Sequence, residues 1–463
     1  MALQLPGELL QTLSSLDHFD REAFLSVHAS GEQVVSIHLN PGKKHGGFTG
    51  QDTGEENDFL KTKERVPWAP DAYYLNGRPS FTLDPLFHAG CYYVQEASGM
   101  FLAHALGKIM QGEERIRVLD LCGAPGGKST MIQSLLSADS LLVSNELIKT
   151  RVPVLVEQLT KWGYANHVVS NNDPSHFKRL PGFFDVLVVD APCSGSGLFR
   201  RDPGAIQQWS TAAVNLCSQR QKRILADAWD CLREGGWLIY STCSYSPEEN
   251  EEILDFLLDN YPVQPVDLMP DPAWPLVVAR SAHGSLGYRF YPDKVRGEGF
   301  FLSVLQKTAG ESPAATGKKV YSKNRLPISV RIPVEDWIRK EGSIFLTLDD
   351  GTHYIRESMA GDLETLRDAL YLKKAGIRMG KAAGKDWIPD HELALANNLN
   401  NIIPSLDLGR DQALGYLRGS PTDTGSGIRG WNLVRYEKTG LGWVKVLEGR
   451  TNNYYPKSWR IRR

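Results

Sequence analysis

Cysteine, long apolar runs and net charge are all scarce in this chain. Only six of its 463 residues are cysteines, and none forms a CxxC pair, so neither a disulfide framework nor a structural metal is implied. No stretch approaches the roughly 18 apolar residues of a membrane-spanning helix, and the first residues lack the pattern of a signal peptide. We therefore expect a cytoplasmic protein with no metal and no membrane contact.

Charge is nearly balanced over the whole chain but not at its C-terminus. The formal net charge is −2, so any contact with a polyanion must be local. From Arg429 to Arg463 nine basic residues stand against Glu437 and Glu448, a local excess of about seven. This segment is where we expect polyanion binding.

Apolar strands alternate with helical stretches between residues 115 and 305. This alternation predicts βαβ units and therefore an α/β fold with a Rossmann-like, doubly wound parallel sheet. Ligands of such sheets bind at the carboxyl ends of the strands. The predicted strands are 117–121, 140–144, 166–170, 185–190 and 237–242.

The chain is long enough for several domains of about 100 to 200 residues each. A small α/β module is expected over 1–90 and the sheet domain over 91–307, followed by a Gly-, Ser- and Pro-rich linker at 308–318. An intermediate α/β domain over 319–395 and a β-rich domain over 400–463 complete the prediction. In the last, strands at 431–436 and 441–446 flank a Lys438-Thr439-Gly440 turn, which indicates a hairpin.

The first chemical motif is a glycine-rich turn between a predicted strand and a helix. Such a turn lets the backbone approach a ligand closely and directs helix N–H groups at it. A tight turn that needs glycine only for packing is the alternative. A phosphate loop is disfavoured, because Gly123 and Gly127 are four residues apart rather than five. The motif consists of Cys122, Gly123, Ala124, Pro125, Gly126, Gly127 and Lys128.

Two acidic residues follow the next two strands. Glu146 lies 23 residues after Gly123, where a carboxylate can accept hydrogen bonds from both ribose hydroxyls, although an exposed glutamate at a helix N-terminus is the alternative. Asp173 can accept from an adenine amino group or form an Asx turn or helix cap. Together with the glycine loop, these residues indicate an adenosine-containing cofactor.

Two cysteines follow the fourth and fifth strands. Cys193 lies in Asp190-Ala191-Pro192-Cys193 and Cys243 in Ser241-Thr242-Cys243, so both are expected to face one cleft. Burial as ordinary apolar residues is the usual alternative for cysteine and suits Cys217 and Cys231, which lie on predicted helices. It suits the two loop cysteines poorly.

These motifs resemble those of the RNA cytosine-C5 methyltransferase family, also called the NOL1/NOP2/Sun family. The resemblance rests on Asp-Leu-Cys-Gly-Ala-Pro-Gly-Gly-Lys, Asp-Ala-Pro-Cys-Ser-Gly-Ser-Gly and Ser-Thr-Cys-Ser. Segments 67–90, 95–98 and 297–301 are similar to the bacterial ribosomal small-subunit methyltransferase F branch, and the tail at 440–457 is similar to its PUA-like RNA-binding domain. The resemblance also implies that the module over 1–90 binds RNA, and one departure there is His38, where the family usually places arginine.

The resemblance implies an S-adenosylmethionine-dependent methyltransferase that makes 5-methylcytosine in RNA. It assigns Cys243 to attack on cytosine C6, Cys193 to release of the product and Asp190 to a hydrogen bond with N3, while Lys128 shapes or polarises the site. The cofactor would contact the glycine loop, Glu146, Asp173 and Asp190. Small-subunit rRNA or the assembling subunit is the implied substrate, and the protein is expected to act as a monomer.

Other functions remain open on the sequence alone. A tRNA cytosine-C5 methyltransferase would carry the same motifs, and a catalytically silent RNA-binding assembly factor would keep the fold. An enzyme that methylates amino groups is disfavoured, because Asp190-Ala191-Pro192-Cys193 is not the Asn/Asp-Pro-Pro-Tyr/Phe loop of that chemistry. The target base must be unpaired or flipped. Candidate stacking partners for the base are Tyr73, Tyr74, Phe199 and Tyr245.

Overall fold

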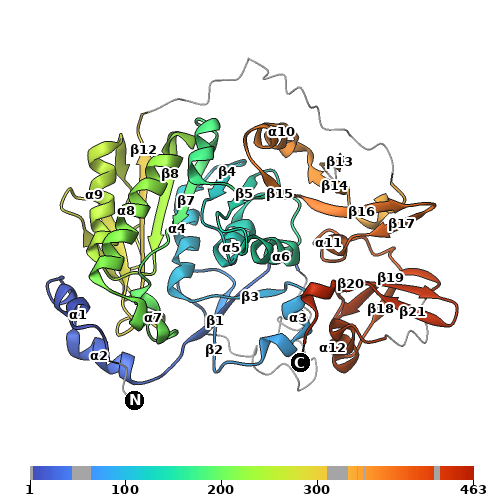
Figure 1. Ribbon diagram of the computed structural model, residues 1–463, viewed down its shortest axis with the longest axis horizontal. Helices are drawn as coiled ribbons and strands as arrows, with labels where there is room; N and C mark the ends of the chain where they lie inside the picture. Colours follow the sequence, from blue (N-terminus) through green and yellow to red (C-terminus); the bar gives the residue numbers. More distant parts are fainter. Residues whose placement is uncertain are drawn as a thin grey trace.

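A single central sheet organises the protein (Figure 1). The computed structural model describes residues 4–43, 64–309, 332–340, 342–348, 350–421 and 428–462. The central sheet has ten strands in the order β10-β11-β12-β8-β7-β4-β5-β6-β15, with β9 also paired to β12. Its five parallel strands confirm those predicted from the sequence. They are β4 (Arg117–Asp120), β5 (Leu141–Asn145), β6 (His167–Ser170), β7 (Phe184–Asp190) and β8 (Leu232–Thr242).

Helices cover both faces of the parallel strands, because alternate residues of each buried strand point to opposite sides. Val118 of β4 packs on one face, and Leu119 packs on the other. The first face is covered by α4 (Leu102–Ile109), α5 (Gly127–Leu135) and α6 (Val152–Trp162). The second is covered by α8 (Thr211–Ala228), α9 (Glu251–Asn260) and α10 (Ala360–Ala369). The expected Rossmann-like doubly wound fold is confirmed.

The strand order fixes where a ligand can bind. From β4 the chain moves outward to β5 and β6 on one side, and then returns to form β7 and β8 on the other. The order therefore reverses between β4 and β7, and the loops that leave these strands diverge at their carboxyl ends. The predicted catalytic and cofactor residues lie at this edge, in loops, at the start of a helix or, for Asp190, at the last position of a strand.

Antiparallel strands extend the sheet at both edges. One edge carries β9 (Val263–Pro265), β10 (Val277–Arg280), β11 (Leu286–Phe290) and β12 (Phe300–Lys307). At the other edge β15 (Leu372–Ala375) pairs with β6. This strand comes from the segment that was expected to form an intermediate domain, so that segment is not structurally separate from the catalytic sheet.

The rest of the intermediate segment forms its own sheet of four strands. Their order is β13-β14-β16-β17, and α11 (His391–Ala394) lies beside them. Residues 310–318 of the expected linker lie outside the described residues, and the expected domain boundaries stay predictions. The strands are β13 (Ser343–Leu348), β14 (Gly351–Arg356), β16 (Ile377–Ala383) and β17 (Asp386–Pro389).

The N-terminal module is built on the predicted strand around Ile37. Here β1 (Val35–Leu39) lies between β2 (Ala72–Leu75) and β3 (Tyr92–Val94), and both pairings are antiparallel. The two N-terminal helices pack against aromatic residues of the catalytic region rather than against this sheet. These helices are α1 (Gly7–Leu13) and α2 (Arg21–Ala29), and the short helices α3 (Pro85–His88) and α7 (Gly204–Gln208) follow later in the chain.

The C-terminal region contains the predicted hairpin, formed by β19 (Gly430–Tyr436) and β20 (Thr439–Leu447). Its turn is one residue earlier than predicted, because Glu437 and Lys438 both adopt positive φ, at 46° and 63°. The pair is flanked by β18 (Ser405–Asp407) and β21 (Arg450–Asn453), and α12 (Arg410–Arg418) packs beside it.

The N-terminal module and the C-terminal region share one apolar core, although they are far apart in the sequence. Ile37 and Leu86 of the N-terminal module belong to the same buried cluster as Tyr416, Val434 and Ile461. Figure 1 shows α3 of the module beside α12 of the C-terminal region. The described part of the chain contains no helix that is long and apolar enough to cross a membrane.

Candidate active site

Two thiols meet at the carboxyl ends of adjacent parallel strands. Cys193 follows β7 and Cys243 follows β8, and the strands are in register with Asp190 opposite Ser241. The two Sγ atoms are 3.1 Å apart, and both side chains are partly exposed. The structure thus brings together the two cysteines that sequence reasoning singled out.

Close backbone packing at Gly197 holds the two cysteine loops against each other. The Gly197 N–H donates to the Cys243 carbonyl at 2.8 Å, and the Gly299 N–H donates to the Gly197 carbonyl at 3.0 Å. A Cβ on Gly197 would lie 2.5 Å from the Gly299 oxygen and 2.7 Å from the Cys243 oxygen. Only glycine fits at this position. Its role in the motif is to let three backbone segments approach one another closely.

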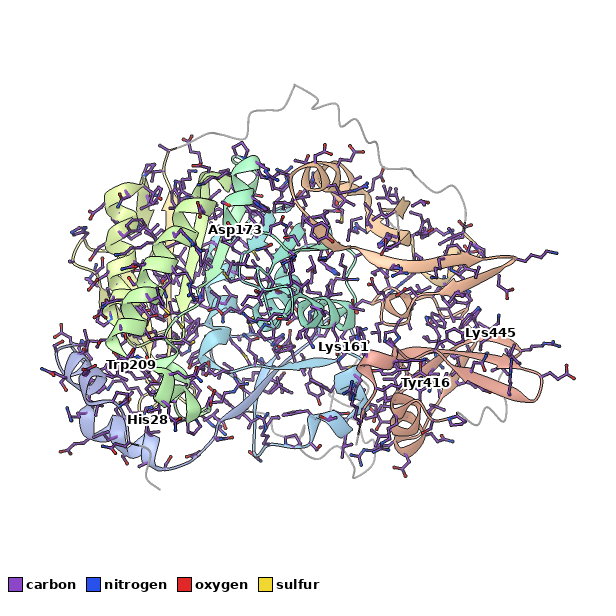
Figure 2. All side chains as sticks on the ribbon, in the orientation of Figure 1. His28, Lys161, Asp173, Trp209, Tyr416 and Lys445 are labelled. Atoms are coloured by element: carbon purple, nitrogen blue, oxygen red, sulfur yellow. The ribbon has the colours of Figure 1, made fainter. Side chains whose placement is uncertain are left out.

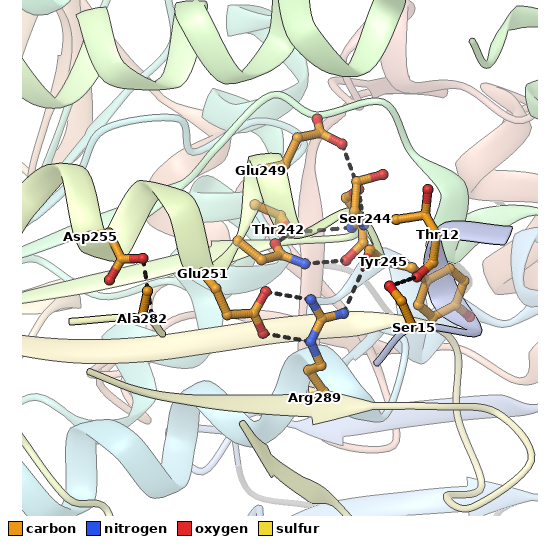
Figure 3. Close-up of polar contacts among 12 residues, drawn as sticks. Thr12, Ser15, Thr242, Ser244, Tyr245, Glu249, Glu251, Asp255, Ala282 and Arg289 are labelled. Carbon is orange, nitrogen blue, oxygen red and sulfur yellow. Dashed lines mark hydrogen bonds and ion pairs between the residues drawn. The ribbon is translucent and has the colours of Figure 1, made fainter. Parts of the chain in front are cut away.

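A buried carboxylate also joins the two loops, and sequence reasoning missed it. Glu249 accepts from the Ser194 N–H at 2.7 Å, the Ser194 hydroxyl at 2.5 Å and the Ser244 hydroxyl at 2.5 Å. Figure 3 shows it beside the Cys243 loop. Burial raises the pKa of Glu249, and these hydrogen bonds oppose that effect. The only sequence signal was an acidic residue shortly after Ser-Thr-Cys-Ser.

Arg289 anchors the other side of the Cys243 loop. Its guanidinium donates to the Tyr245 carbonyl at 2.8 Å and forms a buried ion pair with Glu251 (Figure 3). Because Tyr245 comes two residues after Cys243, this contact fixes the direction in which the loop leaves the thiol. It too was not predicted.

Lys128 and Asp190 form an ion pair beside the thiols. Lys128 Nζ donates to Asp190 Oδ2 at 2.7 Å, and Ser241 donates to Asp190 Oδ1 at 2.9 Å. The Lys128 side chain is only 19% exposed, and its ammonium lies 5.3 Å from the centre of the Phe300 ring. Lys128 is therefore not a lysine that merely faces solvent at the start of a helix.

The charges around these groups shift their pKa values. The hydrogen bond with Cys243 and burial together raise the pKa of Cys193 well above its usual value. Burial alone would lower the pKa of Lys128, but Asp190 and other negative neighbours raise it, so the ammonium stays charged. Cys193 therefore remains a thiol at neutral pH, and Lys128 remains a cation.

Hydrogen bonds among buried polar residues hold the glycine loop in place. Ser129 donates to Asp120 at 2.6 Å, and the Gly123 N–H donates to the Asn145 carbonyl at 2.7 Å. A Cβ on Gly123 would come within 3.0 Å of the Ser129 hydroxyl. Burial raises the pKa of Asp120 to about 7. With the loop held in this way, the first N–H groups of α5 are directed at the cleft, where they can bind a carboxylate.

Glu146 lies directly after β5 and is nearly buried, at 4% exposed. Its carboxylate accepts from the Ile148 N–H at 2.8 Å and lies 3.5 Å from the Arg151 guanidinium. Arg151 also donates to the Ala124 carbonyl of the glycine loop. The side chain is therefore tied to the loop, and it is not the exposed glutamate of the alternative interpretation.

Asp173 occupies the position of a helix cap. Its carboxylate accepts from the Ser175 N–H at 3.0 Å and from the Ser175 hydroxyl at 2.6 Å. These hydrogen bonds lower the pKa of Asp173. The residue, labelled in Figure 2, caps the 3-10 helix that follows β6. The cap is the interaction that the geometry shows, and contact with adenine stays a prediction.

Three of the four aromatic candidates for base stacking are core residues. Tyr74, Phe199 and Tyr245 are at most 3% exposed, and Tyr245 stacks on Tyr291. Their rings pack inside the protein, so they offer no face to a base. Only Tyr73 remains partly exposed.

His38 also points inward. It is 3% exposed, lies 3.2 Å from the Thr130 hydroxyl of α5 and stacks on Tyr93. Burial lowers the pKa of His38 to about 3, so the ring is neutral. This position therefore connects the N-terminal sheet to α5.

Two cysteines outside the active site are residues of the apolar core. Cys91 and Cys231 are buried, and burial raises the pKa of each. Cys217 lies on α8 as expected, whereas Cys231 ends a short 3-10 turn. Among the described residues, no group of histidine, cysteine and acidic side chains could hold a metal ion.

Three family models match successive parts of the chain. The N-terminal domain of 16S rRNA methyltransferase RsmF matches residues 5–97, 16S rRNA methyltransferase RsmB/F matches 108–306, and the methyltransferase RsmF PUA domain matches 403–461. Proteins named ribosomal RNA small subunit methyltransferase F from Shewanella piezotolerans and Vibrio cholerae are each 28% identical to the chain, over 85% of it and 84% of the relative.

A solved structure supports the same fold. The methyltransferase homolog protein from Pyrococcus horikoshii is 25% identical, with a TM-score of 0.50, and the match covers 65% of this chain and 100% of that one. The glycine loop, the fold and the family matches agree on an enzyme whose methyl donor is S-adenosylmethionine. The chain belongs to the 16S rRNA methyltransferase RsmB/F family and is an S-adenosylmethionine-dependent RNA methyltransferase.

Proposed function

We propose that the protein methylates C5 of a cytosine in 16S rRNA through a covalent bond between Cys243 and C6 of the base. The observation that carries this proposal is the pair of thiols, 3.1 Å apart, beside the Lys128–Asp190 ion pair. Methyl transfer to an amino group needs no thiol, whereas C5 of cytosine is too weak a nucleophile without one. A covalent adduct divides this difficult step into easier ones.

Attack begins with Cys243 as a thiolate. Its sulfur forms a bond to C6, and the displaced electron pair turns C5 into an enamine-like nucleophile. For the attack Asp190 must carry a proton, which it donates to N3 of the base, so that the electron pair displaced into the ring is neutralised. Lys128 keeps Asp190 in place through its ion pair. S-adenosylmethionine supplies the methyl group when it is bound.

The raised pKa of Cys193 supports this division of labour. A Cys193 that keeps its proton before attack fits its assignment to the release step, while the assignment of Cys243 to attack rests on the family resemblance. The hydrogen bond with Cys243 is the largest cause of that raised pKa. Once Cys243 is bound to C6, this cause is removed and Cys193 ionises more easily. It then assists loss of the C5 proton and elimination of the Cys243 thioether.

The cofactor would lie across the carboxyl ends of β4, β5 and β6. We assign its contacts to the loop 122–128 and to Glu146, Asp173 and Asp190. The support is geometric, because Glu146 and the loop are joined through Arg151. The Asp173 assignment requires its free oxygen to reach the adenine while the other oxygen keeps the cap.

RNA binding is assigned in part to the basic C-terminal segment. Several of its cations are exposed and form no ion pair with any described residue: Arg429, Lys438, Arg450, Lys457 and Arg462. Arg435 and Lys445, by contrast, pair with Asp407 and Asp386. Binding should weaken with salt as phosphates regain their counterions.

Point substitutions test this assignment better than truncation. A chain that ends near Gly419 would expose the apolar core that the N-terminal module and the C-terminal region share, and would lose RNA binding through misfolding. Exchanging Lys438, Arg450 and Lys457 for glutamine leaves that core intact. RNA affinity should fall and its salt dependence should flatten, and an unchanged salt dependence would remove this segment from the RNA site.

Bisulfite sequencing tests the substrate assignment. RNA from cells with and without the protein should differ at one or a few cytosines of 16S rRNA, and the methylation should depend on Cys243. A difference in tRNA instead would favour the tRNA enzyme. Absence of any difference, with RNA binding intact, would favour the silent assembly factor.

A further inference from the structure

A polar groove lies between the N-terminal sheet and the loop that follows Cys193. Its walls include Gln33 and Val34, which precede β1, and Val94 and Gln95 at the end of β3. Arg78 contributes from the segment after β2, and Arg201 from the segment after the Cys193 loop. Neither the methyl-transfer chemistry nor the basic C-terminal segment uses these residues.

The groove walls carry two arginines and two acidic residues, but the acidic side chains already have partners within the protein. Glu298 forms a two-point ion pair with Arg200, at 3.1 and 3.2 Å, and both side chains are nearly buried. Glu96 accepts from the N–H groups of Ser98, Gly99 and Glu298, at 2.7 to 2.8 Å. Both carboxylates are therefore satisfied from inside the protein.

The two groove arginines are not satisfied in this way. Arg78 and Arg201 are exposed, and neither forms an ion pair with any described residue. The guanidinium carbon of Arg78 lies 5.8 Å from the centre of the Phe81 ring, and the residue also lines the groove. A guanidinium in this setting suits a phosphate oxygen, which it can bind through two N–H groups.

Two residues that line the groove lie near the catalytic ion pair. A Cβ placed on Gly99 would lie 3.9 Å from the Gln95 amide nitrogen, 3.7 Å from a Glu96 carboxylate oxygen and 3.9 Å from Lys128 Nζ. The polar ends of Gln95 and Glu96 therefore lie near Lys128, which is itself 2.7 Å from Asp190.

We propose that this groove binds the single-stranded RNA next to the target cytosine, with Arg78 and Arg201 on its phosphates. The inference rests on the proposed function, because the cleft must hold a base that is unpaired and has flanking nucleotides. Val34 and Val94 provide apolar contact for a neighbouring base, and Gln33 and Gln95 provide amides for its edge. The groove therefore holds the strand so that the target base enters beside Lys128.

Salt-dependent binding tests the groove. The probe is a short single-stranded RNA of mixed sequence, measured by fluorescence anisotropy over a range of salt concentrations. Arg78→Gln and Arg201→Gln should each lower the slope of log K against log salt by about 0.7, the value for one phosphate on a single strand. Arg280→Gln is the matched control, since Arg280 is an exposed arginine on the edge strand β10, and its slope should equal that of the wild type.

Turnover separates the groove from the chemistry. With a methylatable RNA, the double variant Arg78→Gln/Arg201→Gln should raise KM for RNA roughly tenfold, the effect of about 1.4 kcal/mol, while kcat and S-adenosylmethionine affinity stay unchanged. A 4-thiouridine next to the target cytosine should crosslink to the peptide that contains Val94 and Gln95.

The groove and the proposed reaction can fail independently. If the wild type forms 5-methylcytosine but the double variant matches it in salt slope, KM and crosslinking, the groove assignment is overturned. If the arginine variants lower the salt slope but no 5-methylcytosine forms, the groove stands and the reaction is wrong.

Discussion

Removing the Glu249 carboxylate should separate the two catalytic loops. Glu249→Ala deletes three hydrogen bonds of 2.5 to 2.7 Å, two to Ser194 and one to Ser244. A hydrogen bond to a charged group contributes about 1.5 kcal/mol or more, and water entering the space recovers part of the loss. We therefore expect the variant to lose about 3 to 5 kcal/mol of stability.

The effect on catalysis should exceed what this instability explains. Because the bonds position Cys193 and Cys243 through their neighbours, the rate of Cys243 adduct formation should fall about 100-fold at a temperature where the variant is folded. The assay is a single-turnover measurement of the denaturant-stable protein–RNA adduct in a Cys193→Ala background.

Two further variants make the Glu249 test specific. Glu249→Gln keeps the shape and one acceptor oxygen, so adduct formation should recover in part. Glu252→Gln removes an exposed carboxylate from the first turn of α9, three residues further along the chain, and should have no effect. If Glu249→Ala is folded and forms the adduct at the wild-type rate, the positioning role of Glu249 is refuted.

Three other perturbations test the cofactor site, the close packing of the cysteine loops at Gly197 and the buried histidines. Glu146→Ala should weaken S-adenosylmethionine binding by about 1.5 to 3 kcal/mol, and unchanged affinity by calorimetry would remove Glu146 from the site. Gly197→Ala should abolish adduct formation, since its Cβ would collide with the Cys243 carbonyl, and a normal rate would show that the loops can move apart. Burial lowers the pKa of His38 and His391 to about 3 from an ordinary 6.5, so the stability from keeping these rings neutral is complete above pH 6.5 and is lost as pH falls towards 3. Each should cost about 2 kcal/mol at pH 5, and urea midpoints that do not fall between pH 7 and 5 would contradict this.

The parallel strands and their loops could be predicted because their signals are local. Each strand is a short apolar run that ends in a chemically distinctive loop, so the sequence alone places Cys193, Cys243 and Lys128 at one edge of the sheet. Because ligands of parallel sheets bind at the carboxyl ends of the strands, the position of the site could also be predicted. The hairpin turn was misplaced by one residue, because the sequence marks Gly440 more strongly than Glu437 and Lys438, which adopt the positive φ.

Long-range contacts could not be predicted from the sequence. β15 pairs with β6 although about 200 residues separate them, and nothing in its four residues indicates that partner. Glu249 looked like one acid among several in Ser-Pro-Glu-Glu-Asn-Glu-Glu, and only tertiary structure shows that it alone is buried between the cysteine loops. The core shared by the N-terminal module and the C-terminal region could not be predicted either. An apolar residue in the sequence does not show which other apolar residues it will pack against.

The fate of the covalent adduct in single cysteine variants tests the central claim most directly. After incubation with RNA and S-adenosylmethionine, Cys193→Ala should accumulate a denaturant-stable protein–RNA adduct, because attack proceeds and release is slow. Cys243→Ala and the double variant should form no adduct and no 5-methylcytosine. An adduct that persists in Cys243→Ala and disappears in Cys193→Ala would reverse the roles, and full turnover by Cys243→Ala would contradict the covalent mechanism itself.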